Sequence, residues 1–229
     1  MYQVRFYEGD YRVRQQKAND DNAVAYVEHH FNSSSSSSAS YAVVITGSNA
    51  SQTSKNWGSW YAKAVANFFG TQVGGDDGIK VGGYDGRGDN NLKQTHMPAI
   101  LLEPLFASNP QHANIIRSET GQNALARILV ESIQRFFPNG GLIAFSVGHK
   151  YRTAKPNDRG ASLVGGGEEA DYAEKVLHKA AALLEGTGVI STARTIRVMR
   201  GTEVLYEIEV DEEDVIVWDA NRGLLSIPG

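Results

Sequence analysis

The sequence predicts an α/β protein with a twisted, mostly parallel sheet flanked by helices. Short apolar, β-branched runs alternate with longer segments that carry apolar residues at helical spacing, which is typical of this class. Turn residues such as Gly, Pro, Asn and Asp separate these segments. The length of 229 residues and a hydrophobic fraction of 41% allow one well-packed domain with an appendage.

The first elements follow this alternation closely. Tyr2–Tyr7 is predicted to be a strand, and Tyr11–Asn22 is a polar segment with helical character. Ala23–Glu28 is a short apolar run that leads into two histidines, so it is predicted to be the next strand. Ser33–Ser38 is a run of serines, which favours a flexible loop. Tyr41–Thr46 is rich in β-branched residues and is predicted to be another strand.

The middle of the chain continues the pattern. Trp57–Phe69 has apolar residues at helical spacing, whereas Gly74–Asn91 is rich in Gly and Asp and is predicted to be a loop with one short segment around Ile79. Pro98–Leu102 is predicted to be a buried strand, and Asn109 opens a helical region. Gly121–Phe137 is an amphipathic helix that the following Pro-Asn-Gly-Gly stops.

The pattern changes near the C-terminus. Leu142–Val147 is an apolar strand, and Glu169–Glu185 is a strong amphipathic helix. From Val189 onward the sequence alternates as in antiparallel strands: RTIRVMR, TEVLYEIEV and DVIVWD. We therefore expect a main domain over residues 1–188 and a β-rich C-terminal appendage of unknown role over residues 189–229.

Composition excludes several functions. The net charge of −4 is spread along the chain without a strongly basic stretch, which argues against nucleic-acid binding. The absence of cysteine rules out disulfides and thiolate metal sites, so a metal site must use His and carboxylates. No apolar run is long enough for insertion into a membrane, and the first ten residues carry no basic-then-apolar secretion signal.

Four polar residues stand where chemistry is expected. His30, Glu103 and His149 follow apolar strands, and ligand sites of α/β sheets lie beyond the carboxyl ends of strands. Glu169 opens a helix, where the amide dipoles favour a carboxylate. Two imidazoles and one carboxylate suit zinc, and a further carboxylate can take a proton from water. Glu168 competes with Glu169 for the ligand role.

The sequence motifs around these four residues support this hypothesis. The segment Thr95–Gln111 has Pro-Ala before an apolar strand, then Glu103, then Phe-Ala-Ser-Asn. YVEHHFN places His30 two residues before Asn32, and SVGHKYRTAKPNDRGA contains a Gly-His pair at His149. GGGEEADYAEKVLHKAAALL is a helix headed by Glu169. Together these motifs resemble the zinc-dependent N-acetylmuramoyl-L-alanine amidases of the amidase-3 type, over roughly residues 1–188.

The resemblance implies a function. His149, Glu169 and His30 would bind Zn²⁺, and Glu103 would be the catalytic base. The substrate would be peptidoglycan, cut between N-acetylmuramic acid and the L-alanine of the stem peptide. The motifs match in a rotated order, from residue 139 to the end and then from residue 1, so the chain resembles a circularly permuted family member. A phage-encoded lysin, made in the host cytoplasm and acting on the cell wall, is the expected context.

Some features depart from the family. Lys150 and Tyr151 follow His149 where the family usually has glycines, which affects access to the metal. Two other functions stay open: another zinc peptidase or amidohydrolase, and a non-catalytic wall-binding or virion module. The sequence leaves the oligomeric state open. His112 and His178 are predicted to lie at the surface, and His29 is predicted to point away from His30.

Overall fold

The structure is a computed structural model of the whole chain, and it describes residues 1–186, 194–200, 203–210, 217–219 and 224–226. The chain divides into two compact units, Met1–Gly188 and Val189–Gly229. The first unit contains all the residues predicted to form the site.

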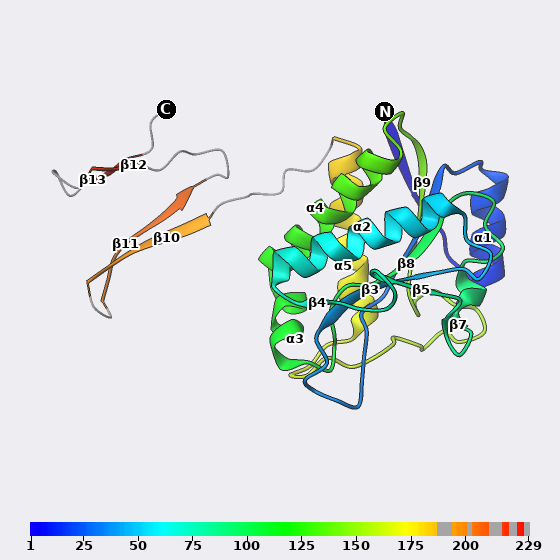
Figure 1. Ribbon diagram of the computed structural model, residues 1–229, viewed down its shortest axis with the longest axis horizontal. Helices are drawn as coiled ribbons and strands as arrows, with labels where there is room; N and C mark the ends of the chain where they lie inside the picture. The colour runs from blue at the N-terminus through cyan, green and yellow to red at the C-terminus, as the bar shows by residue number, and fades with distance from the viewer. Residues whose placement is uncertain (187–193, 201–202, 211–216, 220–223, 227–229) are drawn as a thin grey trace. The chain divides into compact units, whose positions relative to one another are not determined.

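The first unit alternates strands and helices along the chain (Figure 1). Its helices are α1 (Tyr11–Asp20), α2 (Gln52–Phe69), the 3₁₀ helix η1 (Asp89–Asn91), α3 (Pro110–Arg117), α4 (Glu119–Phe136) and α5 (Glu169–Leu184). Its strands are β1 (Tyr2–Phe6), β2 (Ala25–His29), β3 (Tyr41–Thr46), β4 (Gln72–Val73), β5 (Ile79–Val81), β6 (Gly83–Tyr84), β7 (Arg87–Gly88), β8 (Ala99–Glu103) and β9 (Gly141–Val147).

The main sheet has seven strands in the order β1-β9-β2-β8-β3-β4, with β5 also paired to β3. The pairs β1–β9, β9–β2 and β2–β8 are parallel, and β3 runs antiparallel to β8. The predicted α/β class with a mostly parallel sheet is therefore confirmed. The antiparallel direction of β3 was not predicted, because the sequence pattern of a buried strand does not encode its direction.

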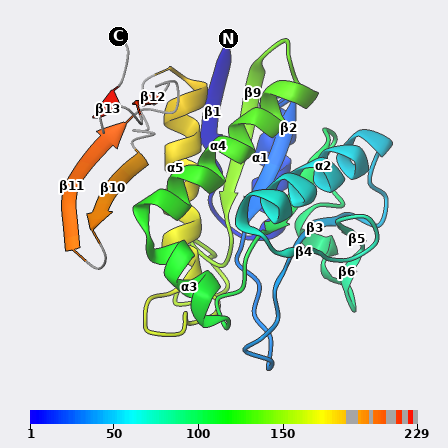
Figure 2. The ribbon, with the colours of Figure 1, turned by 60° about the vertical axis from the view of Figure 1, so that its left-hand side comes forward.

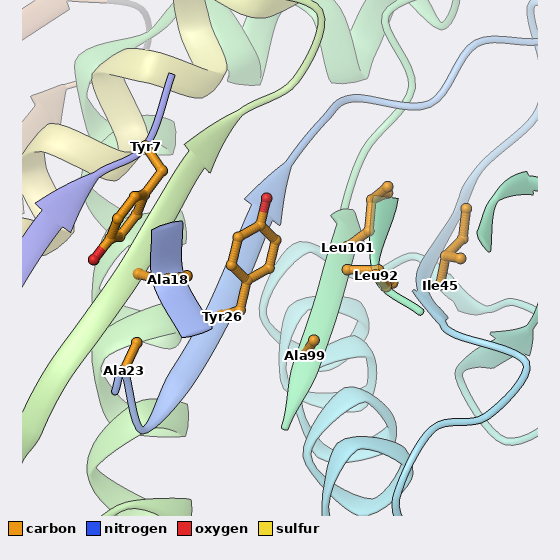
Figure 3. Close-up of a cluster of buried hydrophobic side chains, with 9 residues drawn as sticks. Tyr7, Ala18, Ala23, Tyr26, Ile45, Leu92, Ala99 and Leu101 are labelled. Carbon is orange, nitrogen blue, oxygen red and sulfur yellow. The ribbon is translucent and has the colours of Figure 1, made fainter. Parts of the chain in front are cut away.

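Helices cover both faces of this sheet. α2 packs against β3 and β8, α5 packs against β1, β9 and β2, and α4 packs between α2 and α5, so these three helices share one face (Figure 2). On the opposite face, Ala18 of α1 and Leu92 after η1 join a buried cluster with sheet residues such as Tyr26 and Leu101 (Figure 3). Both faces of the parallel strands are thus buried, as parallel sheets require.

Capping residues explain where several helices begin. Ser51 accepts a hydrogen bond from the backbone of Ser54, so α2 begins at Gln52, five residues before the predicted apolar stretch. Asn109 caps α3 through the backbone N–H groups of Gln111 and His112, and Pro110 occupies the first turn. In the stretch 74–91, the short segment predicted around Ile79 is β5, and the short strands β6 and β7 lie where a loop was predicted.

The second unit contains two antiparallel pairs. β10 (Arg194–Arg200) pairs with β11 (Glu203–Val210), and β12 (Val217–Asp219) pairs with β13 (Leu224–Ser226). The first three residues of the predicted strand DVIVWD lie outside the described residues. Among the described parts of both units, no helix is long and apolar enough to cross a membrane.

Candidate metal centre

The register of three neighbouring strands sets the position of the site. His29 at the end of β2 lies opposite Leu102 of β8 on one side and Val147 of β9 on the other. The carboxyl ends of the three parallel strands therefore meet at one edge of the sheet. Glu103 is the last residue of β8, and His30 and the Gly148-His149 pair directly follow β2 and β9. The sequence prediction that these side chains share one edge thus follows from the observed register.

Three side chains converge at this edge. The Oε1 atom of Glu169 lies 3.2 Å from Nδ1 of His30 and 3.1 Å from Nε2 of His149. The three potential ligand atoms of His30, His149 and Glu169 all lie within 4.8 Å of one another. Zinc bonds of about 2.0–2.1 Å in a tetrahedral arrangement place neighbouring ligand atoms about 3.3 Å apart. The spacing of these side chains therefore fits a zinc ion with three protein ligands.

The second carboxylate oxygen of Glu169 is held by the backbone. The N–H of Ala161 donates a hydrogen bond of 2.7 Å to Oε2 of Glu169, and the N–H of Glu169 donates to the carbonyl of Ala161. This reciprocal contact fixes the first turn of α5 against the loop that precedes it. Oε1 is left facing the two histidines. Glu169 itself is buried, with a side chain only 4% exposed.

Two glycines make room for the ligand side chains. A Cβ atom at Gly148 would overlap the imidazole ring of His30. A Cβ atom at Gly160 would overlap the carboxylate of Glu169 and the ring of His149, and Gly160 also has a left-handed φ of 76°. The backbone therefore approaches the cluster so closely that only glycine fits at either position.

Each histidine uses its second ring nitrogen to contact another carboxylate. Nε2 of His30 lies 2.9 Å from Oε1 of Glu28, and Nδ1 of His149 lies 2.9 Å from Oδ1 of Asp158. Asp158 also pairs with Arg152 at 3.2 Å. Such contacts fix the tautomer and the orientation of a metal-binding imidazole. Nδ1 of His30 and Nε2 of His149 are therefore the nitrogens available to a metal.

Burial and pairing shift the pKa values of this cluster. Burial lowers the pKa of His30, but its hydrogen bonds with Glu169 and Glu28 outweigh burial and raise that pKa above the usual range. Burial raises the pKa of Glu169, but hydrogen bonds with His149 and His30 outweigh it and lower the pKa. A metal ion bound here would have to displace the proton that His30 shares with Glu169, so its affinity is expected to fall as the pH falls.

Glu103 lies beside this cluster, and its pKa is raised, whereas the pKa of Glu169 is lowered. Burial and, to a smaller extent, the charge of Glu169 raise the pKa of Glu103 to about 7, against the opposing charges of His30, Arg87 and His149. Its Oε2 atom is buried and has no hydrogen-bond partner among the described residues. A carboxylate with a pKa near neutrality is suited to general acid–base catalysis.

The structure separates the alternatives that the sequence left open. Glu168 lies outside the cluster, where its carboxylate accepts hydrogen bonds from the hydroxyl of Ser162. His29 is fully buried on the other side of the strand, and its ring packs against Phe31. His29 and Glu168 are therefore not placed to join Glu169, His30 and His149.

One surface prediction was wrong. His112 is only 5% exposed: its Nδ1 accepts a hydrogen bond from the backbone N–H of Phe106, and its Nε2 lies 3.1 Å from the hydroxyl of Ser40. The polar neighbours in the sequence hid this role, because α3 turns the histidine inward. His178 is exposed, as predicted, and stacks on Phe6.

Lys150 and Tyr151 form a tether that their positions in the sequence did not indicate. Nζ of Lys150 lies 2.5 Å from a carboxylate oxygen of Glu174, and the hydroxyl of Tyr151 donates to the other oxygen. Both His149 and Tyr151 have left-handed φ angles, of 62° and 63°. The two side chains therefore tie this tight turn to α5.

The fold and the site together define an α/β protein with a His-His-Glu cluster at the strand ends. The model of the N-acetylmuramoyl-L-alanine amidase family matches residues 4–135. The chain belongs to this family. The matched segment contains His30 and Glu103, whereas His149 and Glu169 lie beyond its end. The comparison with curated proteins gives no match.

Solved structures of similar proteins include several amidases. The catalytic domain of CwlV from Bacillus (Paenibacillus) polymyxa var. colistinus is 26% identical with a TM-score of 0.47, over 56% of this chain and 66% of that one. The amidase from Clostridium difficile 630 is 22% identical with a TM-score of 0.49, over 58% and 67% of the two chains. The putative amidase from Neisseria meningitidis is 21% identical with a TM-score of 0.42, over 55% and 63%. The chain thus spans about two thirds or less of these structures.

The close approach at Gly148 gives a first prediction. Gly148→Ala is expected to push the ring of His30 out of line and to weaken zinc binding roughly 10- to 100-fold, the range seen when ligand positioning is disturbed. Competition with a chromophoric chelator measures the zinc dissociation constant. Gly70→Ala is the control, because Gly70 caps α2 in a left-handed conformation with open space around it. It is expected to lower stability and leave the zinc affinity unchanged; equal affinities for Gly148→Ala and wild type would contradict the prediction.

The unpartnered carboxylate of Glu103 gives a second prediction. Its folded-state pKa is about 7 instead of 4.5, so its ionisation costs stability as the pH rises between these values, and the full cost is present above pH 7. Glu103→Gln is therefore expected to stabilise the metal-free protein by about 1–3 kcal/mol at pH 8 and to have little effect near pH 4.5. Urea unfolding at both pH values measures this difference.

The matched control for this experiment is Glu119→Gln, because the side chain of Glu119 is 81% exposed and pairs only with Lys179 among the described residues. It is expected to leave stability nearly unchanged at both pH values. A Glu103→Gln protein that is less stable than wild type at pH 8 would rule out the proposed environment of Glu103.

Proposed function

We propose that this chain is a zinc-dependent peptidoglycan amidase, which cleaves the amide bond between N-acetylmuramic acid and the L-alanine of the stem peptide. The observation that carries this proposal is the convergence of His30, His149 and Glu169, which come from segments as far as 139 residues apart in the chain. Family membership supports the substrate class. Two imidazoles and one carboxylate form a ligand set that zinc hydrolases use. The sequence has no cysteine that could serve as a thiolate ligand instead.

The residues have separate roles in this proposal. Zinc, when bound, would supply a Lewis acid that activates water and stabilises negative charge on the carbonyl oxygen. His30, His149 and Glu169 would bind the ion. Glu103 would accept a proton from the attacking water and then deliver it to the nitrogen of the leaving L-alanine. Its raised pKa favours both steps near neutral pH, because the group can exchange protons readily there.

The proposal makes a prediction about turnover. Purified peptidoglycan treated with the zinc-loaded protein is expected to release new N-terminal alanine without new reducing sugar ends, and a chelator is expected to stop this. Glu103→Gln is expected to lower the rate by about 10²- to 10⁴-fold, the usual contribution of general acid–base catalysis, while zinc stays bound. Labelling of free amines followed by mass spectrometry counts the products.

Each outcome of this assay has a meaning. Full activity of Glu103→Gln would show that Glu103 is not the base. A zinc-saturated wild type that releases no alanine would overturn the amidase proposal, and cleavage of a different amide in the same material would assign another zinc peptidase or amidohydrolase. A protein that binds the wall and cleaves nothing would be a binding module.

We also propose that the chain is a circular permutation of the family's order. The strand β9, which leads into His149, lies between β1 and β2 in the sheet although it follows both in the chain. The family match begins at residue 4 and ends within α4, before β9 and α5. These two elements supply His149 and Glu169. A rotated order explains why the family model matches only part of the chain although all the residues of the proposed site are present.

The positions of the chain segments support this proposal. The backbone N–H of Val4 donates to Oε1 of Glu185 at 2.9 Å, so the end of α5 lies beside β1. The N–H of Gly141 donates to the carbonyl of Met1 at 3.1 Å, and the hydroxyl of Tyr2 donates to the carbonyl of Phe137. A short link from the end of α5 to β1 could therefore replace the existing link from α4 to β9. Such neighbouring ends are what makes permutation tolerable.

This arrangement is testable by reordering. In the reordered chain, residues 139–188 come first, followed by a short linker and residues 1–138. One continuous match to the family model is expected to cover this chain, and it would include both Glu169 and His30. The reordered protein is expected to fold and to bind zinc within a fewfold of residues 1–188 in their present order, which is the control. A family match that still begins at residue 4 would contradict the proposal, as would a reordered chain that stays unfolded while the control folds.

The expected role as a phage-encoded lysin stays a prediction that follows from the proposed substrate. A lysin acts on the cell wall, so addition of the purified protein to cells with permeabilised outer layers would be its natural assay. Residues 189–229 form their own unit, and their function is left open.

A further inference from the structure

A fully buried carboxylate lies directly behind the candidate metal centre. Glu28 is in β2, two residues before His30, so both side chains point to the same side of the strand. Its side chain has no exposed surface. Burial of a charged group is costly unless it is paired and hydrogen-bonded, so its presence in the central strand requires compensating contacts.

Those contacts satisfy both oxygens of Glu28. Oε1 lies 2.9 Å from Nε2 of His30 and accepts a hydrogen bond of 2.5 Å from the side chain of Asn91. Oε2 accepts from the hydroxyls of Ser146 and Tyr26, at 3.2 and 3.3 Å. Tyr26 lies in β2, His30 directly follows β2, Ser146 lies in β9 and Asn91 lies in η1. The carboxylate is therefore fixed in position by three separate parts of the fold.

A buried arginine connects this carboxylate to the second histidine. Arg14 of α1 is fully buried and donates from Nη1 to the hydroxyl of Ser146 at 2.7 Å and to the carbonyl of Val147 at 2.8 Å. It also donates to the carbonyls of Gly9 and Lys150. The guanidinium thus balances the charge of Glu28 through Ser146 and holds the backbone on both sides of His149.

We propose that Glu28 is a positioning residue, which keeps a proton on Nε2 of His30 and thereby directs Nδ1 of His30 toward Glu169 and His149. The proposal rests on the zinc site proposed above and adds a residue that does not touch the metal. If the ring were flipped about its Cβ–Cγ bond, carbon atoms would take the positions of Nδ1 and Nε2, so Glu28 and Glu169 would each lose their imidazole partner. The buried charge would then be left without its main hydrogen bond, and this cost selects the observed orientation.

The test measures zinc affinity and ring chemistry instead of turnover. Zinc dissociation constants are determined by chelator competition for wild type, Glu28→Gln and Glu28→Ala. Glu28→Ala is expected to weaken zinc binding about 10- to 100-fold, as loss of an orienting carboxylate usually does. Glu28→Gln keeps an acceptor oxygen and is expected to lose less. Ser132→Ala is the control, because Ser132 is a fully buried hydroxyl between α2 and α4 that accepts from the indole N–H of Trp57.

Long-range ¹H–¹⁵N spectra of the histidine rings in zinc-loaded wild type test the geometry without any substitution. The expected result is a metal-bound Nδ1 and a protonated, slowly exchanging Nε2 on His30. Binding through Nε2 would overturn the proposal even if the Glu28 variants failed to fold. Zinc affinities of both variants within twofold of wild type, or an equal loss in Ser132→Ala, would also overturn it. A wild type that binds no zinc would instead refute the proposed function.

Discussion

The site depends on the placement of β9 between β1 and β2. This insertion brings the end of β9 level with the end of β2, because Val147 lies opposite His29. The turn that follows carries His149 back over the edge of the sheet, and α5 then starts with Glu169 at the same edge. If β9 occupied an outer position, the two histidines would be separated by another strand, about 4.8 Å farther apart. The seven-stranded sheet is thus the frame on which the proposed metal ligands meet.

Charge alternates through the interior of this frame. Glu28, His30, Glu169, His149 and Asp158 form a continuous chain of acidic and imidazole groups, with Arg14 and Arg152 at its two ends. Each buried charge has a partner of opposite sign or a hydrogen bond, which is the condition for tolerating it in a low-dielectric interior. One carboxylate oxygen of the buried Glu103, by contrast, has no partner among the described residues. Burial of an unpaired carboxylate lowers the stability of the fold, so a role in catalysis explains the presence of Glu103 better than a role in stability does.

The sequence predicted that His30, His149 and Glu169 would lie together, but it did not indicate the residues that support them. The strand-end positions of His30, Glu103 and His149 were readable because apolar runs stop directly before them, and strand alternation separated His30 from His29. The same alternation places Glu28 on the face of His30, so the position of Glu28 could also have been predicted from the sequence. Asp158 gave no such signal, because it lies in an irregular loop whose path the sequence pattern does not define.

Other features could not be read from the sequence for definable reasons. The antiparallel direction of β3 depends on the path of the chain between strands, not on the apolar pattern within the strand. The burial of His112 depends on how α3 is turned against the sheet, and its polar neighbours gave the opposite indication. The need for glycine at Gly160 arises from a tertiary approach to Glu169 and His149, which only the folded chain brings about.

The most direct measurement is anomalous diffraction at the zinc absorption edge from crystals of the protein grown with zinc. The account predicts one strong peak at bonding distance, about 2.0–2.2 Å, from Nδ1 of His30, Nε2 of His149 and an oxygen of Glu169. A crystal saturated with zinc that shows no peak among these three side chains, or a peak coordinated by other residues, would contradict it.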